Sequence, residues 1–141
     1  MERFLNSKKY PDFLKFQLPV LIWMALIYTL SSMRGSTYSP FEFPEAHLIA
    51  HSLLFGMLYY LGYRALRYQN FSRFLSEFSL VMTLFFVILY AAADEYHQSF
   101  VPGRTEDIKD LLVDTTAAVV VLFVVLLKDK LRPKERNWGT P

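Results

Sequence analysis

The chain has 141 residues, a net charge of +2 and no cysteine, and 53% of its residues are hydrophobic. A soluble domain of this length has too little interior to bury so much apolar surface. The lack of cysteine excludes disulfides, thiolate catalysis and cysteine-ligated metals.

Four long apolar segments follow one another along the chain. They lie at about residues 16–32, 47–66, 78–93 and 111–127. Each approaches the roughly 20 residues that a helix needs to cross a bilayer, and a helix satisfies its own backbone hydrogen bonds in lipid. The sequence therefore predicts an all-α integral membrane protein, a four-helix bundle that passes several times through the cell membrane.

The first two segments need individual comment. The first follows a basic stretch, but it is long, contains Trp23 and lacks an A-x-A cleavage site, so we interpret it as a retained span and not as a signal peptide. The second is the weakest span because it carries His47, His51 and Arg64. Arg64 can extend its charged head to the membrane surface from a helix end, whereas the histidines need another explanation.

Basic residues alternate in density along the chain. They concentrate before the first span, at and between the ends of spans two and three, and after the fourth span, whereas the other two connections hold only Arg34, Arg104 and Lys109. Because cytoplasmic segments collect Lys and Arg, both termini are predicted to be cytoplasmic. We expect a cytoplasmic segment at 1–15, a membrane domain at 16–127 and a basic cytoplasmic tail at 128–141.

Polar residues concentrate in "DEYHQSFVPGRTEDIKDLLVD", residues 94–114, between the last two spans. The predicted topology brings this stretch to the outer face, together with the start of the second span. Because ionisable groups inside a membrane usually mark functional sites, we expect a ligand-binding site there. Its candidate residues are His51, Asp94, Glu95, His97, Gln98, Arg104, Asp110 and Asp114.

Helical spacing predicts how the residues at the end of the third span are oriented. Asp94, His97 and Gln98 share one helix face, and Glu95 is expected to turn aside. His47 and His51, four residues apart, also share a face, and we interpret His47 as an interfacial residue without a role.

The acids at the start of the fourth span form a stripe with spacings of three and four residues. Asp114 is expected to lie deepest, where a carboxylate needs a partner. The planar fork of Arg104 makes it the expected partner. For Asp107 and Asp110, a purely structural role is an equal alternative, because the helix dipole favours acids in the first turns.

The stretch "DEYHQSFVPGRTEDIKDLLVDTTAA" resembles the D-E-x-x-Q-x-F-x-P-G-R signature of the VanZ-like family of small membrane proteins. The "SS" that ends the first span and the second histidine of "HLIAH" resemble weaker motifs of that family. The resemblance covers residues 28–120. Asp114 stands where relatives frequently carry asparagine, and His47 stands where they often carry an acid.

The resemblance implies a role in the bacterial cell envelope, because the family takes its name from a protein linked to teicoplanin resistance. The expected partner is the headgroup of a membrane lipid or cell-wall precursor, held by Arg104. We expect no nucleic-acid partner, and assign no cofactor and no metal ligand. The residues leave catalysis and oligomeric state open.

Three alternatives stay open. A metal-dependent membrane hydrolase acting on a lipid or cell-wall precursor would use the histidines with Asp94 or Glu95 as ligands. A small transporter would use Asp114, although no relay reaches the cytoplasmic side. In a purely structural role, the polar cluster would only hold the helices together.

Overall fold

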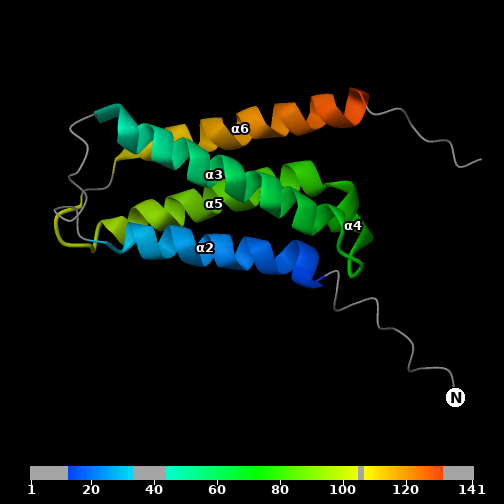
Figure 1. Cartoon of the computed structure of the whole chain (residues 1–141), viewed down its shortest axis with the longest axis horizontal. Helices are drawn as coiled ribbons and strands as arrows, with labels where there is room; N and C mark the ends of the chain where they lie inside the picture. Colours follow the sequence, from blue (N-terminus) through cyan, green and yellow to red (C-terminus); the bar gives the residue numbers. More distant parts are fainter. Residues whose placement is uncertain (1–12, 34–43, 105–106, 132–141) are drawn as a thin grey trace, which may run out of the picture.

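The computed structural model describes residues 13–33, 44–104 and 107–131, and in these ranges the regular structure is helical, without strands (Figure 1). The predicted all-α class is therefore confirmed. The elements are the π-helix η1 (Phe13–Gln17) and the α-helices α2 (Leu18–Ser31), α3 (Pro44–Arg67), α4 (Arg73–Glu77), α5 (Ser79–Gln98) and α6 (Ile108–Leu131).

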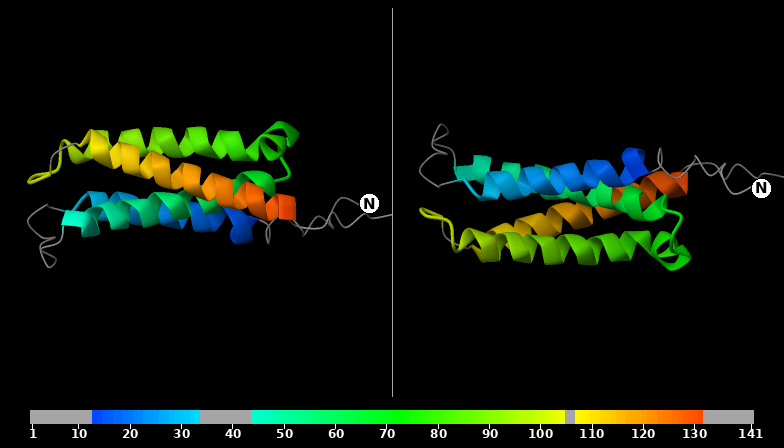
Figure 2. Two further views of the ribbon diagram at one scale, coloured as in Figure 1. Left: turned by 90° about the horizontal axis from the view of Figure 1, so that it is seen from above. Right: turned by 90° about the horizontal axis from the view of Figure 1, so that it is seen from below.

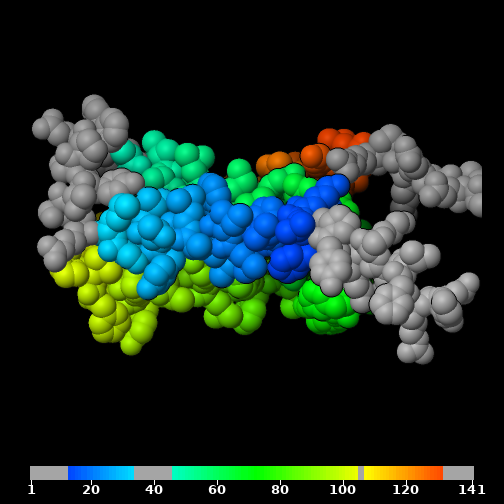
Figure 3. Space-filling view, turned by 60° about the horizontal axis from the view of Figure 1, so that its bottom comes forward, coloured from blue at the N-terminus to red at the C-terminus, as the bar shows by residue number. Residues whose placement is uncertain are grey.

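The long helices α2, α3, α5 and α6 lie side by side, and neighbours in the sequence run in opposite directions (Figures 1 and 2). Helix α3 is central, because it packs against α2, α5 and α6. Helix α2 contacts α3 and α5, and in the described residues it does not reach α6. The space-filling view shows α2 running along one face of the molecule (Figure 3).

The packed helices have two ends that differ in composition. The acidic end comprises the last turn of α2, the start of α3, the end of α5, the start of α6 and the turn at 99–104. The basic end comprises η1, the last turn of α3, helix α4 and the last turns of α6. Both described chain ends, Phe13 and Leu131, lie at the basic end (Figure 1).

Apolar side chains fill the space between the helices and also cover the outside. Ile27, Phe55 and Val87 are buried in the core, while Leu53 and Phe85 remain more than 60% exposed. An outer surface of large apolar side chains is costly in water. It is favourable in lipid, because the surrounding lipid tails are themselves apolar.

Within the residues that the structure describes, three helical segments are long and apolar enough to cross a membrane: Phe13–Ser31, Ser79–Gln98 and Ile108–Leu131. They correspond to the first, third and fourth predicted spans. The second predicted span is a continuous helix, α3, but its composition is less apolar than that of the other three. Crossing of the membrane by all four helices therefore stays a prediction.

The connection between the second and third predicted spans contains a short helix that the sequence analysis did not predict. Helix α4 begins after Ser72, whose side chain accepts a hydrogen bond from the Leu75 amide at 3.3 Å. Gln69 accepts hydrogen bonds from the Phe71 and Ser72 amides at 2.7 and 2.8 Å. These side-chain acceptors satisfy backbone donors that a short helix cannot satisfy itself.

Candidate functional site

Among the described residues, four carboxylates are buried at the acidic end of the helices. Asp94 and Glu95 lie in the last turn of α5, and Asp110 and Asp114 lie in the first two turns of α6. Asp114 is completely inaccessible, and the other three are at most 7% exposed. Burial of a carboxylate is costly unless a donor or cation compensates it, so the partners of each one define what the site can do.

His51 and Asp114 form the most deeply buried pair. The Nδ1 atom of His51, on α3, lies 3.0 and 3.3 Å from the two carboxylate oxygens of Asp114, on α6. His51 as a whole is 6% exposed, and its ring stacks on that of Phe55 with 6.1 Å between the ring centroids. The prediction that Asp114 lies deep is confirmed, but its predicted partner Arg104 is wrong, because His51 occupies that position.

Arg104 instead ties the turn at 99–104 to the end of α2. Its guanidinium donates to the carbonyls of Met33 and Leu30 at 3.1 and 3.2 Å, and to Gln98 Oε1 at 3.2 Å. Gly103, with φ of 80°, provides the left-handed backbone that turns the chain just before Arg104. Helix ends leave carbonyls unsatisfied, and two such carbonyls at the C-terminus of α2 accept from Arg104. Together with the Gln98 amide oxygen, they hold the guanidinium away from Asp114.

Gln98 connects Arg104 to the carboxylates. Its Nε2 donates to Asp94 Oδ2 at 2.9 Å, while its Oε1 accepts from Arg104. The predicted shared face of Asp94 and Gln98 is therefore present as a direct hydrogen bond. The Gln98 amide therefore bridges Arg104 and Asp94, which do not form an ion pair with each other.

Glu95 points into the cluster, so the expectation that it turns aside is wrong. Its Oε2 accepts from the Asp107 backbone amide at 3.1 Å, and its Oε1 is buried without any hydrogen-bond partner in the described structure. Both Asp94 and Glu95 are buried because α5 is packed against α2, α3 and α6. Contacts on several sides bury a wider part of the α5 surface than the single buried face that the helical spacing predicted.

His97 and His47 lie beside the cluster. His97 Nε2 is 2.9 Å from Ser32 Oγ, and its ring packs on Tyr28 at 4.7 Å between centroids. It therefore joins α5 to α2 and does not take part in the carboxylate group. The half-exposed His47 has Nδ1 3.5 Å from Asp110 Oδ1, and its ring lies 4.5 Å from that of His51.

Two further residues contribute to this end without having been predicted as site residues. Ser31 is 4% exposed, and its hydroxyl has no hydrogen-bond partner in the described part of the chain. The "SS" at the end of the first span was the available signal for it. Asp107 precedes α6 and accepts from the Lys109 amide at 2.9 Å, which is the structural role weighed for it from the sequence.

In the described part of the chain, two groups of side chains bring metal-ligating atoms together. His51, Glu95 and Asp114 each offer one ligand atom within 4.8 Å of the others. His47, His51 and Asp110 do the same. Both groups include His51, and the first consists entirely of buried residues. Imidazole nitrogen with carboxylate oxygen suits zinc and other first-row divalent metals.

Comparison with known proteins places the chain in a family. The family model described as VanZ/LLP1 matches residues 16–129, which is most of the chain and includes every residue of the candidate site. No curated protein and no solved structure gives a significant match. Together with the three apolar helices long enough to cross a membrane, the match identifies a membrane protein. The chain belongs to the VanZ/LLP1 family.

Proposed function

We propose that this protein acts in the bacterial cell envelope, and that its acidic end forms an outer-face site for the anionic headgroup of a membrane lipid or cell-wall precursor. The observation that carries this proposal is the concentration of four buried carboxylates, His51, Gln98 and Arg104 at one end of the helices. Packing alone does not need so many desolvated groups, and intramembrane ionisable residues usually mark binding or transport sites.

Arg104 is the residue best suited to contact an anionic headgroup. A guanidinium has five N–H groups, and three nitrogens of Arg104 each donate one hydrogen bond to the chain. Two N–H groups therefore remain for a ligand. Arg104 is only partly buried, so a phosphate or carboxylate can approach it and be held by charge-assisted hydrogen bonds.

The distribution of basic residues supports the orientation. Lys15, Arg64, Arg67, Lys128 and Lys130 all belong to the basic end. Cytoplasmic segments carry such an excess, so the acidic end would face outside. In this arrangement all four long helices cross the membrane, the described chain ends are cytoplasmic, and the site meets the outer leaflet and the cell-wall precursors.

The experiment that tests this function measures teicoplanin and vancomycin susceptibility in a glycopeptide-sensitive Gram-positive host. Wild type, Arg104→Ala, Asp94→Ala and the control Arg73→Ala are expressed at matched membrane levels. Arg73 is an exposed residue at the basic end, paired with Glu77. We expect wild type and Arg73→Ala to raise the teicoplanin tolerance, and the two site variants to lose that effect.

Two outcomes would contradict the proposal in different ways. If no protein changes susceptibility at equal abundance, the glycopeptide role is wrong. If Arg104→Ala and Asp94→Ala need much stronger induction than Arg73→Ala to reach the matched membrane level, the cluster has the structural role of holding the helices together. Membrane blots of the variants distinguish the two outcomes.

A metal-dependent hydrolase acting on a lipid or cell-wall precursor is the second candidate function. One observation favours it: Glu95 Oε1 is buried without a hydrogen-bond donor, next to His51 and Asp114, and ligand atoms of the three lie within 4.8 Å. A divalent cation bound there would compensate the buried carboxylates. His97 does not belong to this ligand set, because it is held by Ser32 and Tyr28.

The chemistry of such a site would be the addition of water across an ester or phosphoester bond. The water oxygen would form a bond to the carbonyl carbon or the phosphorus, the bond from that atom to the leaving oxygen would break, and the leaving oxygen would take up a proton from the water. A cation at His51, Glu95 and Asp114 would activate that water. Arg104, on the same end of the molecule, would hold the substrate's anionic group.

Elemental analysis of gently purified protein tests the second candidate. We expect about one divalent transition metal per chain in wild type, and a clear loss in Glu95→Gln, which retains size but removes the charge. Glu77→Gln, on the exposed surface at the opposite end, is the matched control and should retain the metal. A stoichiometry near zero in wild type, or equal metal content in all three proteins, would exclude the hydrolase.

A further inference from the structure

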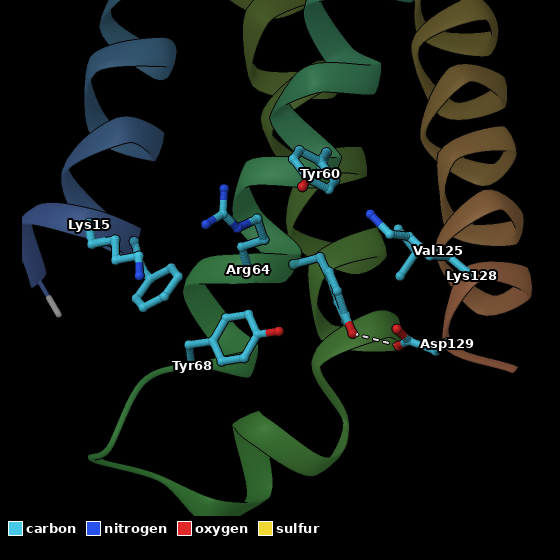
Figure 4. Close-up of a pocket in the computed structure, with 9 residues that line it drawn as sticks. Lys15, Tyr60, Arg64, Tyr68, Val125, Lys128 and Asp129 are labelled. Carbon is cyan, nitrogen blue, oxygen red and sulfur yellow. Dashed lines mark hydrogen bonds between the residues drawn. The ribbon is translucent and has the colours of Figure 1, made fainter. Parts of the chain in front are cut away.

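A groove at the basic end carries an inference that is independent of the acidic end. Figure 4 shows this groove between η1, α3 and α6. It has a volume of about 440 Å³. The residues that the argument uses are Lys15 and Phe16 of η1, Tyr60 and Arg64 of α3, and Lys128 and Asp129 of α6.

The arrangement of the helices explains why the groove exists. Helix α3 packs against η1 and α2 on one side and against α6 on the other, while α2 and α6 make no contact with each other in the described residues. The face of α3 between them is therefore left uncovered at the basic end. Tyr60 and Arg64, one turn apart, form the floor, and the flanking helices form the two walls (Figure 4).

Two of the three cations of the groove contact aromatic rings and are not neutralised by a carboxylate. The Arg64 guanidinium carbon lies 5.3 Å from the centre of the Phe16 ring and 5.7 Å from that of Tyr60. Lys15 Nζ also lies 5.3 Å from the Phe16 ring. Cation–π contacts of this kind orient a charge and leave its hydrogen-bond donors available. None of the three cations, Lys128 included, forms an ion pair within the described structure.

The carboxylate that lines the groove is already engaged. Asp129 Oδ2 accepts a hydrogen bond from the Tyr63 hydroxyl at 2.9 Å (Figure 4). This contact links α3 to α6 across the groove. The groove therefore has three cations against one carboxylate, so its net charge attracts an anion.

Membrane proteins commonly carry Lys and Arg at their cytoplasmic ends, and this bias accounts for the number of cations. It does not account for a groove in which Arg64, at the floor, contacts two aromatic rings. Arg73 illustrates the difference, because it lies at the same end, is 91% exposed in its side chain and pairs with Glu77 at 2.7 Å. A cation outside a binding site is hydrated or pairs with a surface carboxylate, as Arg73 does with Glu77.

We propose that this groove binds the phosphate of an anionic membrane lipid from the leaflet at the basic end. Arg64 would donate to the phosphate oxygens from the floor, and Lys15 and Lys128 would approach from the two walls. Apolar surface continues from the groove along α6, where Val124 and Leu127 are 57% and 59% exposed. An acyl chain can lie against that surface while the headgroup occupies the cavity.

The test is a titration of detergent-purified full-length protein with phosphatidylglycerol, with bound lipid counted by native mass spectrometry. Wild type is compared with Arg64→Gln, Lys128→Gln and the control Arg73→Gln, and with phosphatidylcholine as the neutral lipid. We expect about a tenfold loss of phosphatidylglycerol affinity for each groove variant, as expected for one charge-assisted contact. The control and wild type should bind alike.

Three outcomes would overturn the proposal. Equal phosphatidylglycerol affinity in all four proteins would remove the groove as the site. Equal affinity of wild type for phosphatidylcholine would remove the recognition of charge. Soluble glycerol phosphate that binds as tightly as the lipid would make the ligand a free phosphate ester. Lys128 is exposed, so its variant provides the answer even if Arg64→Gln does not fold.

Discussion

At the scale of single residues, the acidic end separates charges from one another with intervening neutral groups. Arg104 reaches Asp94 only through the amide of Gln98. Asp114 pairs with His51, whose charge can vary, and not with a permanently charged arginine. The site therefore retains carboxylate oxygens that are not committed to a fixed cation, of which Glu95 Oε1 is the clearest example.

Replacing His51 by alanine should destabilise the protein strongly. The change leaves Asp114, which is 0% exposed, without its partner at 3.0 Å. A buried carboxylate left without any compensating donor costs about 3–5 kcal/mol of unfolding free energy. Asp114→Asn should change this free energy by only about 1 kcal/mol, because an amide oxygen still accepts a hydrogen bond from His51. Denaturant titration in mixed micelles measures both variants.

The comparison between these two variants is what matters. A small effect of Asp114→Asn would mean that the position requires a hydrogen-bond acceptor and not a charge. Equal destabilisation by His51→Ala and Asp114→Asn would contradict this view. The negative charge of Asp114 would then itself be needed for stability.

At the scale of elements, two glycines on α3 allow close approach of its neighbours. A Cβ atom at Gly62 would lie 3.1 Å from Thr83 Cγ2 on α5. A Cβ atom at Gly56 would lie 3.4 Å from Val121 Cγ2 on α6, which is ordinary contact. Small residues at such positions are typical of helix contacts in membranes, where packing replaces the hydrophobic effect as the driving force.

We expect Gly62→Ala to destabilise the protein and Gly56→Ala to be tolerated. Thr83 is 0% exposed and its hydroxyl donates to the Ser79 carbonyl at 2.6 Å, so its methyl group cannot easily move away. Overpacking at Gly62 should cost about 1–3 kcal/mol. Alanine at Gly56 should stay within about 1 kcal/mol of wild type, because it also favours the helix. Thermal unfolding in detergent measures the relative stabilities of wild type and the two variants.

A second substitution separates overpacking from other effects. Thr83→Ser removes the methyl group that the new Cβ at Gly62 would meet, and keeps the hydroxyl that bonds to Ser79. The double variant should recover most of the stability lost in Gly62→Ala. If Thr83→Ser adds its own loss without any recovery, the 3.1 Å contact does not control the α3–α5 distance.

At the scale of the whole molecule, the two ends can lie on opposite sides of a membrane only if α3 crosses it together with the other long helices. Helix α3 is the least apolar of the long helices, because it carries His47 and His51 near its start and Arg64 and Arg67 near its end. His51 is buried against α6, and Arg64 lies at the basic end. Packed between the more apolar helices, α3 can cross with His51 paired to Asp114 and with Arg64 at the membrane surface.

Cysteine labelling tests this topology, and the natural chain contains no cysteine that would interfere. Single cysteines at Met33, Phe71 and Ser99 lie after α2, before α4 and after α5. An impermeant maleimide on intact cells should label Met33→Cys and Ser99→Cys, and should reach Phe71→Cys only after permeabilisation. All three side chains are exposed.

The pattern among the three positions distinguishes the alternatives. If α3 does not cross, Met33→Cys and Phe71→Cys share a side, and Ser99→Cys lies on the other. If the orientation is inverted, only Phe71→Cys is labelled in intact cells. Equal labelling of all three after permeabilisation is the control that each cysteine is accessible.

The amino-acid sequence by itself determined the four long helices and the neighbourhood of the site. Long apolar runs predict helices whatever packs against them, because a single segment in lipid can satisfy its own backbone hydrogen bonds only as a helix. The alternating direction of these helices brings His51, Asp94, Gln98 and Asp114 to one end, as predicted. These conclusions depend on local periodicity and on chain order, both of which are properties of the sequence.

Only the tertiary structure decided which polar side chains face each other. Helical spacing gives relative angles along one helix, but not the rotation of that helix against its neighbours. The pairing of His51 with Asp114, the inward direction of Glu95 and the place of Arg104 over the end of α2 all depend on that rotation. The basic groove likewise exists because α2 and α6 leave one face of α3 uncovered, which is a relation among three helices that no single segment encodes.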